Sequence, residues 1–274
     1  MKRYIFAADA DGTILMDNLE VHPETIKACK KAQELNHVVV IATGRAVVRT
    51  LPILKKIPYV DYFICNNGAV VYDVKNHKSI YVNGVNPHHY PKILDFARKH
   101  NVTFKLHTDQ DWIGDIGIED QAPTILTDEL DQKIREHIEK FPNDKKLFNK
   151  QIPTQISVNG SMEFCKQFFD QFKIWFGDDS SIFLANDIYI DVNAKNISKW
   201  TGLLELAKTL NLESNQIVTF GDSSNDLEML LGAKSNGYAM KNSKADLIKF
   251  IKPRIGDNNS NAIAQVIYQY INDK

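Results

Sequence analysis

Apolar residues follow two different spacings in the first third of the chain. Unbroken apolar runs within Arg3–Ala8 and His37–Ala42 are typical of strands that are buried on both faces. Pro23–Leu35 and Arg45–Lys55 carry apolar residues at helical spacing instead, and Pro23 suits a first helical turn. This alternation of strand and helix predicts a parallel sheet covered by helices on both faces.

The same alternation returns after residue 197. Ser243, with Asp246 three positions later, forms a capping-box pattern that predicts the start of a last helix there. In chain order we expect a helix, a strand, a helix, a strand and a helix at Ser198–Leu210, Gln216–Phe220, Ser224–Leu231, Asn236–Met240 and Ser243–Phe250.

The middle of the chain has a different texture. Strand-like segments such as Val102–His107 alternate there with single helical segments such as Asp128–Phe141 and Met162–Phe176. We therefore predict an α/β protein whose Rossmann-like parallel core is formed by residues 1–83 and 189–274. Residues 84–188 are expected to form an inserted α+β cap domain.

Composition and charge narrow the range of partners. Of the 274 residues, 43% are hydrophobic, and 33 basic residues nearly balance 34 acidic ones, so no field of one sign favours nucleic acid or anionic lipid. The longest apolar run, Val38–Ala42, is too short to span a membrane, and too few apolar residues precede Asp9 for a signal peptide. Three scattered cysteines indicate reduced thiols. We expect a cytoplasmic protein that binds neither nucleic acid nor membrane, and predict no oligomeric state.

The first strand ends in the acidic sequence Asp9-Ala10-Asp11-Gly12-Thr13, at the edge where open α/β sheets bind ligands. Carboxylate and carbonyl oxygens are suitable ligands for a hard cation such as Mg2+. With a phosphate neutralised by the cation, Asp9 could attack phosphorus as a nucleophile while Asp11 serves as acid and base. The alternative is an acidic turn in which these residues are only turn formers.

Two further segments could complete such a site. Thr43 and Gly44 follow the second strand, where a hydroxyl and backbone N–H groups can hold phosphate oxygens, although Thr43 could equally be an ordinary helix cap. Arg45, beside them, could touch substrate, but we favour a surface position. Asp222 ends a later strand and is a candidate magnesium ligand. Asp226 could support it from the second shell, or could form a capping box with Ser223.

Lys199 lies just before a predicted helix and could balance the charge of Asp9 and a phosphate oxygen. Most lysines are merely solvated, so Lys199 is a candidate only because the other motifs are present. In chain order, the four features are DxDGT at Asp9–Thr13, Thr43, Lys199, and GDxxND at Gly221–Asp226. Together they resemble the haloacid dehalogenase superfamily, and the long insertion makes the chain similar to its Cof-type branch, which carries a type IIB cap.

The resemblance covers nearly the whole chain and implies a role for each matched residue. It implies that magnesium is held by the Asp9 side chain, the Asp11 backbone carbonyl and Asp222, and that Asn225 lies near the phosphate. Asn66-Asn67-Gly68 and Ala239-Met240-x-Asn242 are also similar to family segments. Trp200 and Asn261 depart from it, each standing where the family usually has glycine. Trp200 could shift the backbone near Lys199 or place a ring at the pocket wall.

These features predict a magnesium-dependent phosphatase that hydrolyses a small phosphorylated metabolite, such as a sugar phosphate, nucleotide or phosphorylated cofactor, through an aspartyl phosphate. A phosphosugar mutase or phosphotransferase would use the same intermediate, with a substrate hydroxyl in place of water. A sensor that binds a phosphorylated ligand without turnover is a third possibility. The carboxylates needed for catalysis are all present, which favours the enzyme.

Overall fold

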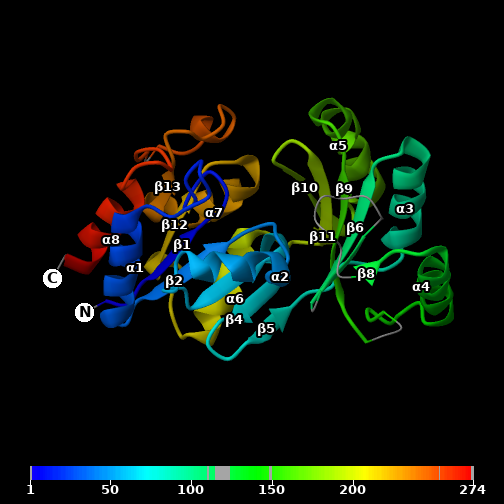
Figure 1. Cartoon of the computed structure of the whole chain (residues 1–274), viewed down its shortest axis with the longest axis horizontal. Helices are drawn as coiled ribbons and strands as arrows, with labels where there is room; N and C mark the ends of the chain where they lie inside the picture. The colour runs from blue at the N-terminus through cyan, green and yellow to red at the C-terminus, as the bar shows by residue number, and fades with distance from the viewer. Residues whose placement is uncertain (1, 110, 115–123, 148–149, 253, 273–274) are drawn as a thin grey trace. The chain divides into compact units, whose positions relative to one another are not determined.

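The computed structural model describes residues 2–109, 111–114, 124–147, 150–252 and 254–272 (Figure 1). Contacts within the chain divide it into two units. Unit 1 comprises Met1–Arg45, Arg49–Tyr81 and Ser198–Lys274, and unit 2 comprises Ala46–Val48 and Val82–Ile197. The border predicted from the sequence, between residues 188 and 189, falls before a strand that pairs within the sheet of unit 2.

Unit 1 is built on a seven-stranded sheet with the order β13-β12-β1-β2-β3-β4-β5. Its first five strands in that order are parallel, and β4 then pairs with β3 in the antiparallel direction. The strands are β1 Ile5–Ala8, β2 Val38–Ala42, β3 Tyr62–Cys65, β4 Val70–Asp73, β5 Lys78–Val82, β12 Ile217–Gly221 and β13 Gly237–Ala239.

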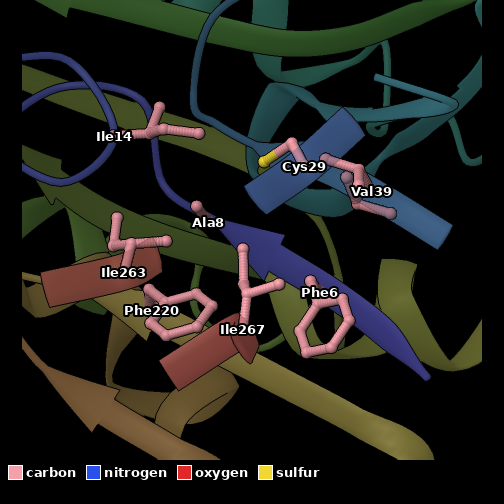
Figure 2. A pocket seen from close by; sticks show the side chains of 9 residues that line it. Phe6, Ala8, Ile14, Cys29, Val39, Phe220, Ile263 and Ile267 are labelled. Atoms are coloured by element: carbon pink, nitrogen blue, oxygen red, sulfur yellow. The ribbon is translucent and has the colours of Figure 1, made fainter. Parts of the chain in front are cut away.

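Helices cover both faces of this sheet. Side chains alternate between the two faces along β1, and all four of its residues are buried. Ile5 and Ala7 face a core that includes Leu203 and Met229 from the helices on one side. Phe6 and Ala8 face the other way, into a small apolar pocket lined also by Cys29 from α1 and by Ile263 and Ile267 from α8 (Figure 2). The α-helices whose bounds fall in or at the edge of unit 1 are α1 Pro23–Glu34, α2 Val47–Thr50, α6 Lys199–Thr209, α7 Leu227–Gly232 and α8 Ala262–Asn272.

Unit 2 is built on a six-stranded sheet with the order β10-β11-β9-β6-β7-β8, and helices pack against it. Neighbouring strands pair in the antiparallel direction, except β7 and β8, which are parallel. Phe104, Leu106, Ile156 and Val158 alternate with polar neighbours along β6 and β9 and form the core. Its strands are β6 Thr103–Thr108, β7 Trp112–Gly114, β8 Thr124–Ile125, β9 Pro153–Asn159, β10 Ser180–Ala185 and β11 Tyr189–Ala194, and its helices are α3 His89–His100, α4 Asp128–Lys140 and α5 Met162–Phe176. The predicted fold class, a Rossmann-like α/β core with an inserted α+β portion, is confirmed.

Two of the predicted helices differ from the structure. The prediction for Ser243–Phe250 was wrong: the chain forms turns with a single 3-10 turn at Leu247–Lys249. Ser243 caps nothing there, because its hydroxyl donates to the Gly221 carbonyl instead. The helix expected at Arg45–Lys55 is split into α2 and a 3-10 segment, Leu51–Lys55, whose second residue is proline.

Within the described ranges, every helix is too short or too polar to cross a bilayer.

Candidate active site

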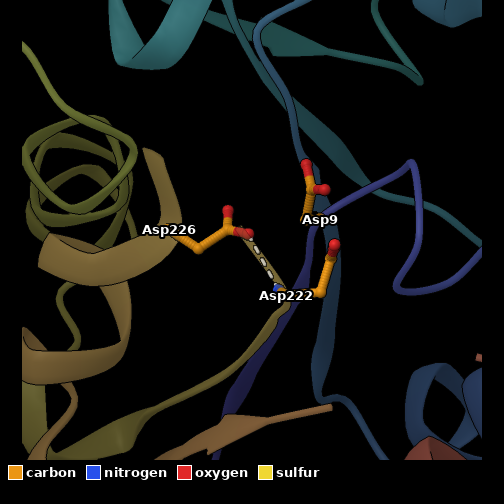
Figure 3. Close-up of side chains that lie close together, drawn as sticks. All are labelled: Asp9, Asp222 and Asp226. Carbon is orange, nitrogen blue, oxygen red and sulfur yellow. Dashed lines mark hydrogen bonds between the residues drawn. The ribbon is translucent and has the colours of Figure 1, made fainter. Parts of the chain in front are cut away.

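The carboxyl ends of β1 and β12 bring two acidic segments together, because these strands pair in parallel with Ala8 beside Phe220. The Asp9 N–H donates to the Phe220 carbonyl at 3.0 Å, which fixes the start of the first loop. One carboxylate oxygen from each of Asp9, Asp222 and Asp226 lies within 4.8 Å of the other two (Figure 3). Residues 213 positions apart in the sequence thus form one acidic cluster.

Lys199 is the counter-ion of this cluster. It is the first residue of α6, a helix that begins with a capping box between Ser198 and Thr201. Its Nζ lies 2.6 Å from Asp9 Oδ1 and 2.6 Å from Asp226 Oδ1, and its side chain is 1% exposed. Burial lowers the pKa of Lys199, but the two carboxylates outweigh it and raise the pKa overall, so the ammonium stays charged.

For Asp9 and Asp222, by contrast, the effect of burial on the pKa outweighs the effect of the nearby positive charge. Burial raises the pKa of Asp9 well above its usual range, opposed by Lys199 and reinforced by the neighbouring carboxylates. Burial also raises the pKa of Asp222 to about 6, together with the charge of Asp226, although a hydrogen bond from the Thr13 hydroxyl at 2.7 Å opposes this. Lys199 is paired with Asp9 and Asp226 and not with Asp222, so the three carboxylates leave excess negative charge that a divalent cation would neutralise.

Asp226 is held differently from the other two carboxylates. Its Oδ2 accepts the backbone N–H groups of Asp222 and Ser223, each at 3.0 Å, while its Oδ1 accepts from Lys199. Ser223 and Asp226 also form the capping box that the sequence offered as the alternative. Asp226 therefore both caps this turn and orients Lys199, which leaves Asp9 and Asp222 as the carboxylates better placed to take a cation.

Asp11 lies next to the cluster, but its carboxylate is bound elsewhere. Arg45 Nε donates to Asp11 Oδ2 at 2.9 Å, and Arg45 Nη2 donates to Asp11 Oδ1. The side chains of Asp11 and Arg45 are 34% and 35% exposed. Arg45 is thus partly exposed, and its guanidinium is also the partner of a candidate acid/base, a contact that the sequence did not indicate.

Thr43 and Gly44 follow β2 and are tied to a second group of polar residues. Thr43 is buried, and its Oγ1 accepts the Arg45 N–H at 3.2 Å. A Cβ on Gly44 would lie 3.0 Å from Asn67 Oδ1, and that same oxygen accepts from Asn225 Nδ2 at 3.2 Å. The structure therefore brings Asn225, Gly44 and Asn67 together.

Asn67 and Gly68 lie beside the site. In the sequence, only the similarity of Asn66-Asn67-Gly68 to a family segment pointed to them. Gly68 has φ +108°, and a Cβ there would lie 1.9 Å from the Ser198 carbonyl oxygen. Asn67 itself has φ 55° and is fully buried. This tight turn after β3 allows the start of α6, and with it Lys199, to approach the site.

The two residues that depart from the family pattern lie at the starts of α6 and α8. The Trp200 ring packs against α7, where a Cβ on Gly232 would lie 2.3 Å from it, and Trp200 joins the apolar core beneath α6. Asn261 directly precedes α8, and its carbonyl accepts the Gln265 N–H at 3.1 Å.

Comparison with known proteins shows the family of this chain. A family model described as haloacid dehalogenase-like hydrolase matches residues 6–267. The chain belongs to this family. The prediction of a phosphatase from the haloacid dehalogenase superfamily, Cof-type branch, is confirmed.

Individual members of the family align along almost their whole length. The chain is 25% identical to the 5-amino-6-(5-phospho-D-ribitylamino)uracil phosphatase of Bacillus subtilis, over 97% of this chain and 95% of that protein. It is 24% identical to the pyridoxal phosphate phosphatase of Escherichia coli, over 99% of this chain and 100% of that protein. A HAD/COF-like hydrolase from Plasmodium vivax has the same fold, with a TM-score of 0.79 at 19% identity, over 99% of this chain and 96% of that one.

Proposed function

We propose that this protein is a Mg2+-dependent phosphatase that hydrolyses a small phosphorylated metabolite through a phosphoryl group carried on Asp9. The observation that supports it best is the buried cluster in which Lys199 lies 2.6 Å from Asp9 and from Asp226, with Asp222 beside them. Such a set of carboxylates around one ammonium has little use in stabilising a fold. It suits a cation and a phosphate, whose charges complement it.

The residues present fit Mg2+, which prefers oxygen ligands and few of them from protein. Carboxylate oxygens of Asp9 and Asp222 would hold it, with the Asp11 backbone carbonyl as a third ligand. Arg45 binds the Asp11 carboxylate, so the backbone is what Asp11 can offer. A bound Mg2+ would neutralise the phosphate, so that an anionic nucleophile could approach phosphorus.

In the first chemical step, a carboxylate oxygen of Asp9 attacks phosphorus and the bond from phosphorus to the alcohol oxygen breaks. Lys199 holds Asp9 Oδ1, which orients Oδ2 for the attack. Asp11, after taking up a proton from solvent, gives that proton to the departing alcohol oxygen; it then takes a proton from the water that attacks phosphorus, as the bond from phosphorus to Asp9 breaks. Asp11 can do so once its carboxylate has turned from Arg45, because a guanidinium occupies both oxygens.

The segment after β2 and Asn225 would bind the phosphate. The Thr43 oxygen accepts the Arg45 N–H, and its hydroxyl can also donate its proton to a phosphate oxygen. The Gly44 backbone N–H and the Asn225 amide provide further donors for phosphate oxygens. These donors would hold the phosphoryl group during its transfer to Asp9 and its release.

The class of substrate rests on the insertion and on the relatives. Two relatives are named for phosphorylated compounds the size of a vitamin or its precursor. We assign unit 2 the role of a cap, which in such enzymes limits access by water and large substrates.

All three cysteines are buried and form no disulfide, which supports a cytoplasmic location.

Release of phosphate from p-nitrophenyl phosphate and a panel of phosphorylated sugars, nucleotides and vitamins tests this proposal. We expect turnover of several of these esters with Mg2+ and none in EDTA. Asp9→Asn should abolish turnover while the protein stays folded, because the amide is nearly isosteric but is not a nucleophile. Full activity of Asp9→Asn, or turnover unchanged by EDTA, would refute the proposal. Transfer of phosphate to an added sugar rather than to water would identify a phosphotransferase.

A further inference from the structure

The segment Met240–Lys244 follows β13, and it contacts the two loops that carry Asp9 and Asp222. Met240 N–H donates to the Gly221 carbonyl at 3.0 Å, and Lys244 N–H donates to the Asp222 carbonyl at 3.0 Å. The Ser243 hydroxyl adds a longer bond to the Gly221 carbonyl. These bonds fix the segment to the end of β12, directly before and at Asp222.

Asn242 reaches from this segment to the loop that follows Asp9. Its Nδ2 donates to the Gly12 carbonyl at 2.7 Å, and its Oδ1 accepts the Asn258 N–H at 3.1 Å. The Asn258 side chain is buried and donates to the Leu15 carbonyl at 3.1 Å. Both asparagines therefore attach the C-terminal part of unit 1 to this loop.

Gly12 is in direct contact with the candidate cation ligand. It has φ +75°, and a Cβ there would lie 2.7 Å from Asp222 Oδ2. The next residue, Thr13, donates its hydroxyl to Asp222 Oδ1 at 2.7 Å. The Asp222 carboxylate is thus bracketed by Gly12 and Thr13, and its position depends on where this loop is held.

We propose that Asn242 is a positioning residue for the cation site, resting on the proposed function above. It fixes the Gly12 carbonyl, so that Gly12 and Thr13 hold the Asp222 carboxylate ready for Mg2+. Without Asn242, the Gly12 carbonyl loses one of the bonds that hold this loop, so Asp222 is less well ordered before the cation binds, and ordering it reduces the free energy of binding. Asn242 should therefore affect Mg2+ affinity more than the rate of the chemical steps.

The test compares Asn242→Ala with Asn259→Ala as a matched control. Asn259 is the same residue type in the same part of the chain, but its side chain bonds only with Asp17 among the contacts found in the described residues. Calorimetric titration of the resting enzyme with Mg2+, without substrate, gives the binding constant directly. Half-activating Mg2+ and kcat at saturating Mg2+ with p-nitrophenyl phosphate complete the comparison.

We expect Asn242→Ala to weaken Mg2+ binding about three- to tenfold, the effect of one lost hydrogen bond, with kcat at saturating Mg2+ nearly unchanged. Asn259→Ala should bind Mg2+ like the wild type. Thermal unfolding in EDTA checks that both variants are folded, which the exposed position of Asn242 favours. If the wild type binds Mg2+ and Asn242→Ala binds it equally well, this inference is wrong and the proposed function stands. If the wild type binds no Mg2+, both are wrong.

Discussion

Replacing Lys199 with methionine removes the ammonium that lies 2.6 Å from both Asp9 and Asp226. Methionine keeps most of the length of the side chain, so packing around it changes little. Removing one partner of a buried ion pair costs about 3–5 kcal/mol, because the other charge is left buried and unpaired. Lys199 is 1% exposed and serves two carboxylates, so we expect about 4–5 kcal/mol in EDTA.

Urea denaturation in EDTA at pH 7.5 measures this loss. Lys208→Met, at an exposed lysine near the end of the same helix, is the matched control and should stay within about 0.5 kcal/mol of the wild type. Adding Asp226→Asn to Lys199→Met should recover part of the lost stability, since one unpaired charge is removed. A Lys199→Met protein within about 1 kcal/mol of the wild type would refute the reasoning.

The pH dependence of Lys199→Met gives a second check on its cause. Burial raises the pKa of Asp9 in the folded protein, so the folded state binds its proton more tightly than the unfolded chain does. Stability linked to this carboxyl therefore rises as the pH falls toward the unfolded pKa of about 3.9. Lys199 opposes this rise in the pKa of Asp9, so removing Lys199 raises it further and makes the gain of stability on acidification larger in Lys199→Met than in the wild type. The deficit of Lys199→Met relative to the wild type should therefore shrink between pH 7.5 and pH 5. A deficit that grows on acidification would contradict unpaired carboxylates as its cause.

Three further predictions concern the turn, the cation and one buried histidine. Gly68→Ala should lower stability by more than about 2 kcal/mol and reduce activity, because its φ is +108° and its Cβ would meet the Ser198 carbonyl at 1.9 Å; a melting temperature like that of the wild type would contradict this. Burial raises the pKa of Asp222 to about 6 and also raises the pKa of Asp9, and Mg2+ binds the ionised carboxylates, so half-activating Mg2+ should rise by at least about tenfold per pH unit below 6; a half-activating Mg2+ that stays level between pH 6 and pH 5 would contradict this. Burial, and then the charge of Arg3, lower the pKa of His37, so its contribution to stability is full above the unfolded pKa of about 6.5 and declines below it. His37→Gln should therefore flatten the loss of stability between pH 7 and pH 5, as measured by urea denaturation.

The sequence predicted those elements whose causes are local. The continuous apolar runs of β1 and β2 and the alternation with α1 and α6 are enough to indicate a parallel sheet with two covered faces. The prediction of a helix at Ser243–Phe250 was wrong: both residues of its capping pattern bond to distant partners, and Asp246 caps only the 3-10 turn at Leu247–Lys249. Ser243 bonds to Gly221, and Asp246 accepts the Ser224 hydroxyl 22 residues away. A capping box read from the sequence has no means of detecting such competitors.

The same distinction holds for the candidate site. Asp9 and Asp222 follow parallel strands, so the order of strands and helices predicts that they meet at one edge of the sheet, whereas Lys199 was singled out only by the motifs around it. The partners of Arg45 and Asn242 are not indicated by any local pattern. Arg45 binds Asp11 34 positions away, and Asn242 binds Gly12 230 positions away. Such contacts depend on loop conformations that only the folded chain defines.

The chemistry on Asp9 can be tested directly by trapping. The enzyme is mixed with a substrate that it hydrolyses, quenched with acid during turnover, reduced with borohydride and digested. Borohydride converts a phosphorylated aspartate to homoserine, so the mass of the peptide that contains Asp9 and Asp11 identifies the modified residue. We predict homoserine at position 9 in the wild type and none in Asp9→Asn. Homoserine at position 11 or at another aspartate, or an active enzyme that yields none at any quench time, would contradict the account.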